Sequence, residues 1–290
     1  MKVHPFQIPK RLHQNLLVQV DREMVFYNKL HQHAEIQFTL IVKGKGKLIV
    51  GDSVHPFEEG NFFVIGPHSP HLFKNDKTDE MAHKISLFFT ETTFGKSFFK
   101  LPDLEELQPL LDISKEGFQV IENTEAIKKT MMLLPDLEKL DRFVCFFSLL
   151  KNLIYADKKT LTNFISPKKM GSSQGQRMQT IFDYVVTHFQ NEIDLNTISG
   201  KVHMTPNAFC KFFKQHTNKT FFQFLIELRI EHACQLLNRS DDRLSILEIS
   251  EQSGFSSISN FNRQFKKLKK VIPSRFAAEQ KRRKSIQDSI

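Results

Sequence analysis

The feature that most constrains the fold is a pattern of two short helices joined by a tight turn, which occurs twice in the C-terminal part of the chain. In the first copy, apolar side chains recur at helical spacing over residues 195–202, and a turn follows at 203–204. Thr205 and Pro206 are residue types that favour the N-cap and the first position of a second helix, which we expect to reach about Gln215. The segment predicts a helix-turn-helix unit.

The second copy lies downstream and has the same order of signals. Residues 246–253 predict a short helix, residues 254–255 a turn, and Ser256 or Ser257 the N-cap of the next helix. Thr205 and Ser257 hold comparable positions 52 residues apart, which indicates an internal duplication. The chain between the copies, residues 221–237, has the apolar spacing of one helix of about 25 Å.

The second helix of each unit has one apolar and one polar face. We expect the apolar faces to be buried; they consist of Phe209, Phe212 and Phe213 in the first unit and of Ile258, Phe261 and Phe265 in the second. The outward faces carry Asn207, Ala208, Lys211 and Lys214 in the first unit and Ser259, Asn262, Arg263 and Lys266 in the second. Held by the connecting helix, these two faces could meet successive major grooves of DNA, about 34 Å apart.

The positive charge is concentrated in the same part of the chain. From residue 172 onward there are 18 Lys and Arg against 11 Asp and Glu, whereas residues 1–171 hold 23 against 21. A basic surface attracts the phosphates of nucleic acids by releasing their counterions, without preference for a base sequence. A solvated basic face would explain the charge equally well, so charge alone does not decide.

Length and composition bound the class of protein. A chain of 290 residues predicts two domains, or two domains and a helical connector. No apolar run approaches the roughly 18 residues that cross a bilayer, and the first residues lack a secretory signal, so we expect a cytoplasmic protein without a membrane partner. Cys145, Cys210 and Cys234 are widely spaced, which favours buried thiols over disulfides or a zinc site.

The remaining chain divides by pattern into three further segments. Residues 1–100 contain short β segments with glycine-rich turns, typical of a sandwich or small barrel. Residues 101–165 predict a helical connector with two helices, separated at Pro135-Asp136, that could also mediate dimerisation. Residues 166–176 are polar and rich in glycine and serine, which indicates a linker before the helical domain 177–284. In the longer connector helix we expect one apolar face made of Leu140, Val144, Phe147, Leu150 and Ile154.

Over about residues 176–284 the sequence resembles the DNA-binding domain of the AraC/XylS family, through F-x-x-x-F-K, L-R-I-x-x-A, I-x-E-I-S, G-F-S and F-N-R-x-F-K-K. The resemblance implies bacterial transcription regulation, usually activation. It implies base or groove contacts at Asn207, Cys210, Lys211, Ser259, Asn260, Asn262 and Arg263, to which we add Lys214 and Lys266. Asn218 and Lys270 stand where the family usually has glycine, and Ile272 where serine is common, so the chain path after Lys269 is open.

A second cluster of polar residues lies in the β region. His31, His33, Glu35 and Gln37 alternate along one strand and therefore share a side, which His55 and His71 could approach across the sheet. Through H-Q-H-A-E-I-Q, a G-x-G turn and G-N-F-F-V-I-G-P-x-x-P-H, residues 20–95 resemble the cupin-type sensor domains of such regulators.

The β region therefore has three readings. We predict that His31, His33, Glu35, Gln37 and His71 bind a small molecule such as a sugar, because imidazole and carboxylate groups suit a polyhydroxyl ligand. The alternatives are a structural polar stripe and a metal site, although Glu35 follows His33 more closely than in metal-binding cupins.

The whole sequence predicts a multidomain α and β protein: a cupin-like β-barrel with a helical connector, then an all-α domain with two helix-turn-helix units. We expect a sequence-specific transcription regulator and not an enzyme, with no catalytic residues, cofactor or bound metal. Its partners would be double-stranded DNA, a small-molecule effector, a second copy of the chain and, for an activator, RNA polymerase. The alternatives are a metal-dependent cupin enzyme with a DNA-localising domain and a non-specific architectural DNA binder.

Overall fold

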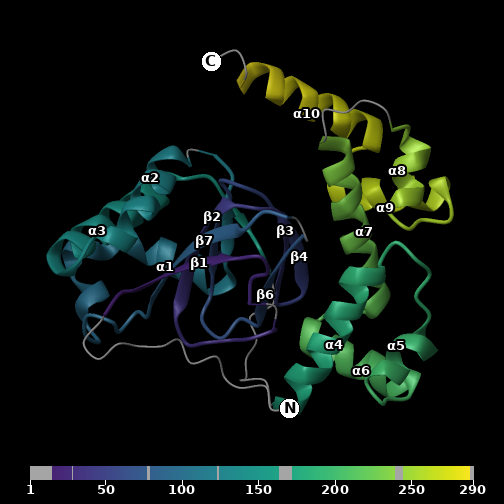
Figure 1. Cartoon of the computed structure of the whole chain (residues 1–290), viewed down its shortest axis with the longest axis horizontal. Coiled ribbons are helices and arrows are strands. Elements are labelled where there is room, and N and C mark those ends of the chain that lie inside the picture. The colour runs from purple at the N-terminus through teal and green to yellow at the C-terminus, as the bar shows by residue number, and fades with distance from the viewer. Residues whose placement is uncertain are drawn as a thin grey trace. The chain divides into compact units, whose positions relative to one another are not determined.

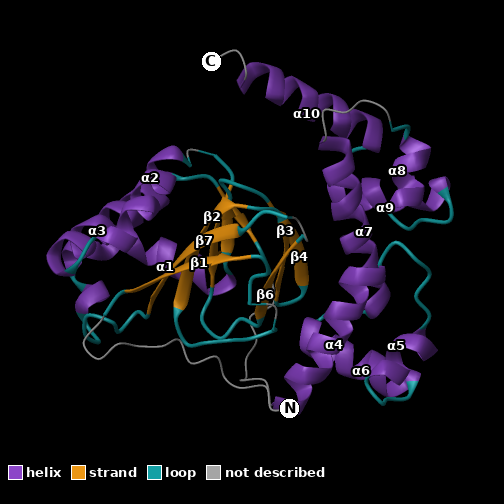
Figure 2. Ribbon diagram, in the orientation of Figure 1, coloured by secondary structure: helices purple, strands orange, loops and turns teal. Residues whose placement is uncertain are grey.

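The computed structural model describes residues 15–27, 29–76, 79–122, 124–162, 172–238 and 244–287. The chain divides into two compact units, Met1–Gln176 and Arg177–Ile290. The first unit contains β-sheets and helices, and the second is entirely helical in the part described (Figure 2). None of the described helices is both long enough and apolar enough to span a membrane.

Two antiparallel sheets form the centre of the first unit. The larger sheet has the order β1-β7-β2-β5-β8-β9, with bounds Leu17–Glu23, Ala82–Phe89, Ile36–Lys43, Phe62–Ile65, Phe118–Val120 and Lys158–Thr160. The smaller sheet has the order β4-β3-β6, with bounds Ser53–Phe57, Gly46–Val50 and His71–Asn75. The sheet and barrel character predicted for this region is confirmed, with β1 and β6 in addition to the strands that the sequence patterns mark.

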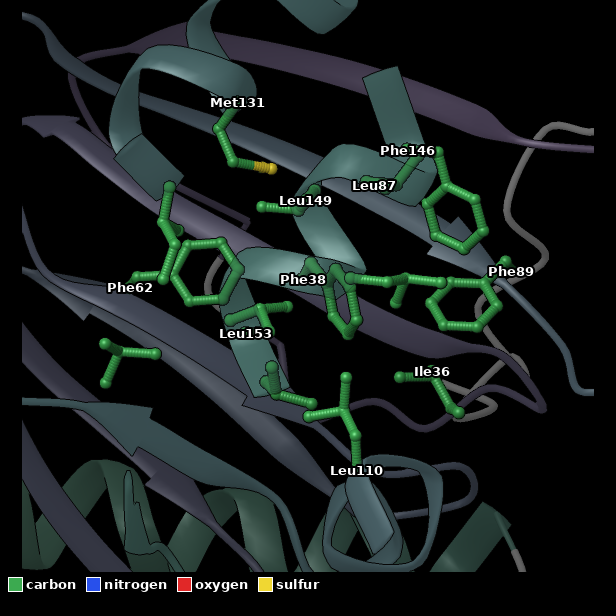
Figure 3. Packing of buried hydrophobic residues seen from close by; sticks show 14 of the residues in the cluster. Ile36, Phe38, Phe62, Leu87, Phe89, Leu110, Met131, Phe146, Leu149 and Leu153 are labelled. Carbon is green, nitrogen blue, oxygen red and sulfur yellow. The ribbon is translucent and has the colours of Figure 1, made fainter. Parts of the chain in front are cut away.

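Strand β2 shows how the alternation of side chains builds two cores. Ile36, Phe38 and Leu40 point to the side of the large sheet that the helices cover. Figure 3 shows this core, in which Phe38 and Phe89 lie among side chains from the helices. Ile41 belongs to a second apolar cluster, which includes residues of both sheets. Because both faces are covered, the polar face of β2 predicted from the alternation is buried as well.

The helices of this unit are α1 (Gln108–Glu116), α2 (Glu125–Leu133) and α3 (Lys139–Tyr155), with 3-10 turns at Phe98–Lys100, Pro102–Leu107 and Leu134–Asp136. They lie on one side of the large sheet (Figure 1). The two predicted helices are α2 and α3, and the break at Pro135 is present. Since β8 and β9 pair with the large sheet, residues 101–162 form part of the first unit and do not make a separate connector.

The apolar face predicted for α3 is only partly buried. Leu140 and Val144 are 71% and 60% exposed, whereas Phe146, Leu149 and Leu153 are fully buried. This helix has apolar residues around most of its circumference, so spacing alone does not select the face that meets the sheet. Phe147, which belongs to the same predicted face, packs in an aromatic cluster with Phe94, Phe98 and Phe143.

The second unit consists of seven helices in its described residues. These are α4 (Ser172–His188), α5 (Leu195–Lys201), α6 (Pro206–Thr217), α7 (Phe221–Asn238), α8 (Ile246–Gln252), α9 (Ile258–Lys269) and α10 (Pro273–Gln287). Helix α4 begins inside the predicted linker 166–176, whose residues 166–171 lie outside the described part. The pairs α5–α6 and α8–α9 confirm the two predicted helix-turn-helix units, and α7 is the predicted connecting helix.

Helix α7 contributes to two apolar clusters, one for each helix-turn-helix unit. In its first half, Phe221 and Phe224 pack on Phe213, while Phe182 of α4 also contacts Phe224. In its second half, residues 230–237 join the apolar cluster of the second helix-turn-helix unit. A single continuous helix therefore packs against both helix-turn-helix units. Cys234 is buried as predicted, but Cys145 is only partly buried and Cys210 is exposed.

Candidate nucleic-acid interface and histidine cluster

Local capping explains where the helices of the first helix-turn-helix unit begin. The Asp194 carboxylate accepts the backbone N–H of Thr197 at 2.9 Å and starts α5. The Thr205 hydroxyl accepts the N–H of Ala208 at 3.3 Å and starts α6, with Pro206 in the first turn. Between them, His203 takes a left-handed conformation with φ of 54°, which closes the turn. The predicted turn and cap are both present.

The second helix-turn-helix unit repeats this arrangement with a stronger first cap. Ser245 and Glu248 form a capping box at the start of α8, in which each side chain meets the other residue's backbone N–H. Gly254 makes the turn with φ of 85°. Ser257, one of the two predicted caps, accepts the N–H of Asn260 at 3.4 Å and starts α9.

The apolar and polar faces of α6 and α9 lie as predicted, with one exception. Phe209, Phe213, Phe261 and Phe265 are fully buried, and Phe212 is buried. Exposed residues are Asn207, Cys210, Lys211 and Lys214 on α6 and Ser259, Asn262, Arg263 and Lys266 on α9. Asn260 is half-buried because its amide oxygen accepts from Arg263 and Gln264. Ile258, predicted to be buried, is 38% exposed because it occupies the first position of α9, next to the cap.

The three departures from the family pattern do not disturb the helices. Asn218 and Lys270 end α6 and α9 in the left-handed conformation, with φ of 56° and 65°. Each donates its N–H to a carbonyl four residues earlier, as a glycine would at this position. Ile272 is exposed before the first residue of α10. The end of α10 carries four consecutive basic residues, 281–284; Lys281 and Arg282 are exposed, and the side chains of residues 283 and 284 lie outside the described part.

The second site is a histidine cluster in the first unit, made of His31, His33 and His71. His31 and His71 are joined by two backbone hydrogen bonds, N–H to carbonyl, of 3.1 and 2.9 Å. One ligand nitrogen of each of the three rings lies within 4.8 Å of the others. The structure therefore brings together residues that are 40 positions apart in the sequence.

Each ring is oriented by a backbone carbonyl. The Nδ1 atoms of His31, His33 and His71 donate to the carbonyls of Lys29, Glu35 and Ser69 at 2.8, 3.0 and 2.8 Å. In a neutral imidazole a protonated Nδ1 leaves Nε2 as an acceptor. Each Nε2 therefore calls for a hydrogen-bond donor or a cation, which the Gln37 amide or a bound ligand can supply.

Gln37 lies at the centre of this cluster. Its Oε1 is 3.0 Å from Nε2 of both His33 and His71, while its Nε2 donates to the Thr39 hydroxyl at 2.7 Å. The two ends of an amide have the same outline, and with the NH₂ group turned toward the rings Gln37 would donate to both. Thr39 continues the network to the Ser86 hydroxyl at 3.1 Å.

The predicted ligand residues are thus placed unequally. His31, His33, Gln37 and His71 meet, and Glu35 lies at the edge, with its carboxylate 3.8 Å from Nδ1 of His33. His55 does not join them, because it bonds to the Leu161 carbonyl at 2.8 Å from β4.

Ser86 and Lys84 belong to this region but were not among the predicted residues. They alternate on β7, and the same two-residue spacing that identified the β2 stripe could have found them.

Burial keeps the three rings neutral. It is the largest cause of the lowered pKa values of His33 and His71, and it lowers the pKa of His31 from 6.5 to about 4. Lys84 adds to the effect at His31 and His71, whereas the Glu35 carboxylate opposes it at His33. At neutral pH the cluster therefore carries little positive charge of its own.

A metal ion would find a suitable donor set here. Three neutral imidazoles, each held through Nδ1 by a carbonyl, are the usual protein ligands of divalent transition metals. The Gln37 amide oxygen could serve as a further oxygen ligand. The residues present fit a metal, and they fit a hydroxyl-bearing ligand equally well.

Comparisons with known proteins agree with both domains. A family model described as a helix-turn-helix domain matches residues 198–279, and one described as a cupin domain matches residues 25–87. The chain is thus a transcriptional regulator with a cupin domain followed by an AraC-type helix-turn-helix domain.

Several curated relatives match most of the chain. It is 22% identical over 254 residues to the uncharacterized HTH-type transcriptional regulator YdeC of Bacillus subtilis, with 85% of each chain covered. It is 21% identical over 246 residues to the HTH-type transcriptional activator RhaS of Pectobacterium carotovorum, covering 84% of this chain and 85% of RhaS. The structure of ToxT from Vibrio cholerae matches 91% of this chain and 97% of ToxT at 17% identity, with a TM-score of 0.35.

Proposed function

We propose that the protein is a sequence-specific regulator that reads two adjacent half-sites on one side of DNA with α6 and α9. The observation that carries this proposal is the exposure of the polar faces of both helices above buried phenylalanines. The second helix of a helix-turn-helix unit enters the major groove, where polar side chains meet base edges. A regulator that binds chromosomal DNA would act in the cytoplasm.

The roles of the outward residues follow from their chemistry. Arg263 can bind both acceptors of a guanine, and Asn207 and Asn262 can bind the donor and acceptor of an adenine. Asn260 and Ser259 at the start of α9 could contact bases or the backbone, and Lys211, Lys214 and Lys266 are suited to phosphates. Cys210 is exposed on α6, but a thiol is a weak donor and we assign it no base.

Selection of bound sequences from a random DNA pool tests this proposal. We expect enrichment of a site with two half-sites about one helical turn apart, bound at least about a thousandfold more tightly than random DNA at a defined salt concentration. A specificity ratio near one would contradict it and would favour an architectural, non-specific binder.

We further propose that the histidine cluster binds the effector. The acceptor-rich arrangement of His31, His33 and His71 around Gln37 supports a ligand with several hydroxyl groups, such as a sugar, with Glu35 at the edge of the site. Binding would shift the population of DNA-competent forms.

Calorimetric titration with a panel of monosaccharides and sugar phosphates tests the assignment. A ligand that binds the wild type and not the His71→Ala variant supports it. Should every binding ligand keep its affinity for that variant, the site lies elsewhere.

A second candidate function is a metal-dependent cupin enzyme with a DNA-localising domain, and the fit of the cluster to a metal favours it. The regulators among the relatives favour the non-enzymatic reading. Metal analysis of the purified protein discriminates between the two. Stoichiometric iron, manganese or zinc that is lost in a His33→Ala variant would favour the enzyme, whereas protein without bound metal would remove this candidate.

We propose that the protein is an activator, as the relative RhaS is named, and would therefore act with RNA polymerase.

We also propose a homodimer through the outer face of α3, where Leu140 and Val144 are exposed. Sedimentation velocity of the Leu140→Gln, Val144→Gln double variant tests the dimer. A wild-type dimer that becomes a monomer supports this face, and a monomeric wild type contradicts it.

A further inference from the structure

The segment before the first helix-turn-helix unit meets the turn of the second unit at a point away from the outward faces of α6 and α9. Residues 189–191 lie between α4 and α5, directly before the first helix-turn-helix unit, and residues 252–255 form the turn of the second helix-turn-helix unit. Arg229 of α7 binds the first of these segments with two donors. Its Nε donates to the Phe189 carbonyl at 2.7 Å and its Nη2 to the Asn191 carbonyl at 2.8 Å.

Gly254 brings the turn of the second helix-turn-helix unit against the segment 189–191. A Cβ atom at this position would lie 2.7 Å from the Phe189 carbonyl oxygen and 2.9 Å from the Arg229 Nε. Those are two atoms of one hydrogen bond. The φ of 85° also favours glycine. Glycine is therefore required here both for its conformation and for the close approach.

Three further contacts bridge the same place. The Gln190 amide donates to the Gln252 carbonyl at 2.7 Å. The Phe255 ring lies 5.9 Å from the Arg229 guanidinium, and the Phe189 ring packs edge-on against His232 of α7. We call this set of contacts the clamp, and its members are Phe189, Gln190, Asn191, Arg229, His232, Gln252, Gly254 and Phe255.

The surroundings of the clamp show why it matters for geometry. The clamp forms part of the wall of an open groove of about 710 Å³, whose lining also includes Asp194 and Ser256. In this groove the two helix-turn-helix units leave open space between them, and the clamp and α7 connect them across that space. A single connecting helix fixes the distance between the two helix-turn-helix units. It fixes their rotation about the helix axis less well, because the side chains that attach each unit to the helix can change conformation.

We propose that Arg229 and Gly254 are positioning residues that set the angle between α6 and α9, and thereby the spacing of half-sites that the protein accepts. The inference rests on the proposed DNA-binding function and adds the residues that determine spacing. Arg229 is suited to this task because its planar fork meets two carbonyls at once, which the single ammonium of lysine cannot copy.

The test uses the full chain and the operator selected from a random pool. In a series of duplexes the spacing between the half-sites is changed by one and two base pairs in each direction, and one duplex keeps a single half-site. The proteins are the wild type, Arg229→Lys, Gly254→Ala and the control Arg275→Lys. The control changes the same residue type at an exposed ion pair with Glu279 on α10.

We expect the wild type and the control to share one preferred spacing. Because rigid linkage makes binding of the second half-site intramolecular, the variants should bind the preferred duplex about tenfold more weakly. They should lose less at the other spacings, so that the profile flattens, while affinity for the single half-site stays unchanged.

Different failures have different signatures. If neither variant flattens the profile, whether both bind like the wild type or lose affinity equally at every spacing and at the single half-site, the clamp does not set spacing. Circular dichroism identifies a variant that fails to fold, and the other variant then decides. Failure to select any operator with the wild type would instead contradict the proposed function itself.

Discussion

At the scale of single residues, Arg263 is the side chain with the clearest expected role. It is exposed on α9, and its Nη2 donates to the Asn260 amide oxygen at 3.0 Å, which holds the guanidinium at the start of the helix. For Arg263→Ala we expect a loss of about 1 to 3 kcal/mol in specific binding if this side chain reads a guanine, and relaxed preference at one base pair. Gel-shift titrations with the selected operator and its single-base variants measure both.

The matched control is Arg275→Ala, which removes an equal charge from α10. We expect it to change affinity slightly and uniformly across sequences. An Arg263→Ala protein with the affinity and base preference of the wild type would exclude Arg263 as a base reader. A uniform loss without relaxed preference would assign it to a phosphate.

The buried histidines predict how stability depends on pH. The folded protein holds the pKa of His31 at about 4, below its ordinary 6.5, and lowers those of His33 and His71 as well. The unfolded chain therefore binds more protons between these values, so the free energy of unfolding is highest above about pH 6.5 and falls as the pH drops toward 4. Lys84 and His68 oppose protonation in the cluster, and Glu35 favours it at His33.

Urea unfolding between pH 7.5 and 4, with a chelator present, measures this slope. Replacing His71 by Gln should flatten it, because one neutral imidazole that the unfolded state protonates is gone. The same replacement at His188, in the second unit, is the control. An equal slope in all three proteins would show that other groups cause the loss.

At the scale of elements, the sequence predicts helix ends better than it predicts the face that a helix buries. Thr205 and Ser257 cap the helices predicted from them, because a hydroxyl next to a free N–H is a local interaction. The buried face of α3 depends on which side meets the sheet, a contact between distant segments, and Leu140 and Val144 lie outside.

Pairing between distant segments also explains what the sequence pattern missed in the first unit and its candidate site. Strands β8 and β9 have three residues each, too few to show alternation, and they form because the edge at β5 needs partners. For the cluster, the predicted alternation groups Gln37 with His33, although His33 lies before β2, and the backbone pairing of His31 with His71 brings the His71 ring to them.

The capping box of α8 allows a prediction about one element. In Ser245→Ala the Glu248 N–H loses its acceptor, and we expect the second unit to lose about 1 kcal/mol of stability. Thr205→Ala at α6 removes a single cap and serves as the comparison. Thermal unfolding followed by circular dichroism measures both, and a Ser245→Ala protein as stable as the wild type would contradict the importance of the box.

At the scale of the whole molecule, the described end of the first unit is tied down just before residues 163–171. The Thr162 hydroxyl donates to the Asp52 carboxylate at 2.5 Å, and His55 bonds to the Leu161 carbonyl at 2.8 Å. Both Thr162 and Asp52 are buried. The segment that leads toward the DNA-binding unit is therefore held by β4 and by the turn between β3 and β4.

The same turn is connected to the histidine cluster. Gly51 donates its N–H to the carbonyl of Pro70, the residue before His71, at 2.8 Å. The cluster and the described end of the first unit therefore share one short stretch of backbone.

This arrangement predicts that damage at Thr162 stays within the first unit. In Thr162→Val the shape is kept, but the buried Asp52 carboxylate loses a donor, which costs about 1 to 3 kcal/mol. Hydrogen exchange read by mass spectrometry should show faster exchange in β3, β4, β8 and β9, and unchanged protection in α5 to α9. Thr92→Val, at an exposed loop position, should leave both units unchanged. Faster exchange in α5 to α9 would instead mean that the two units unfold as one.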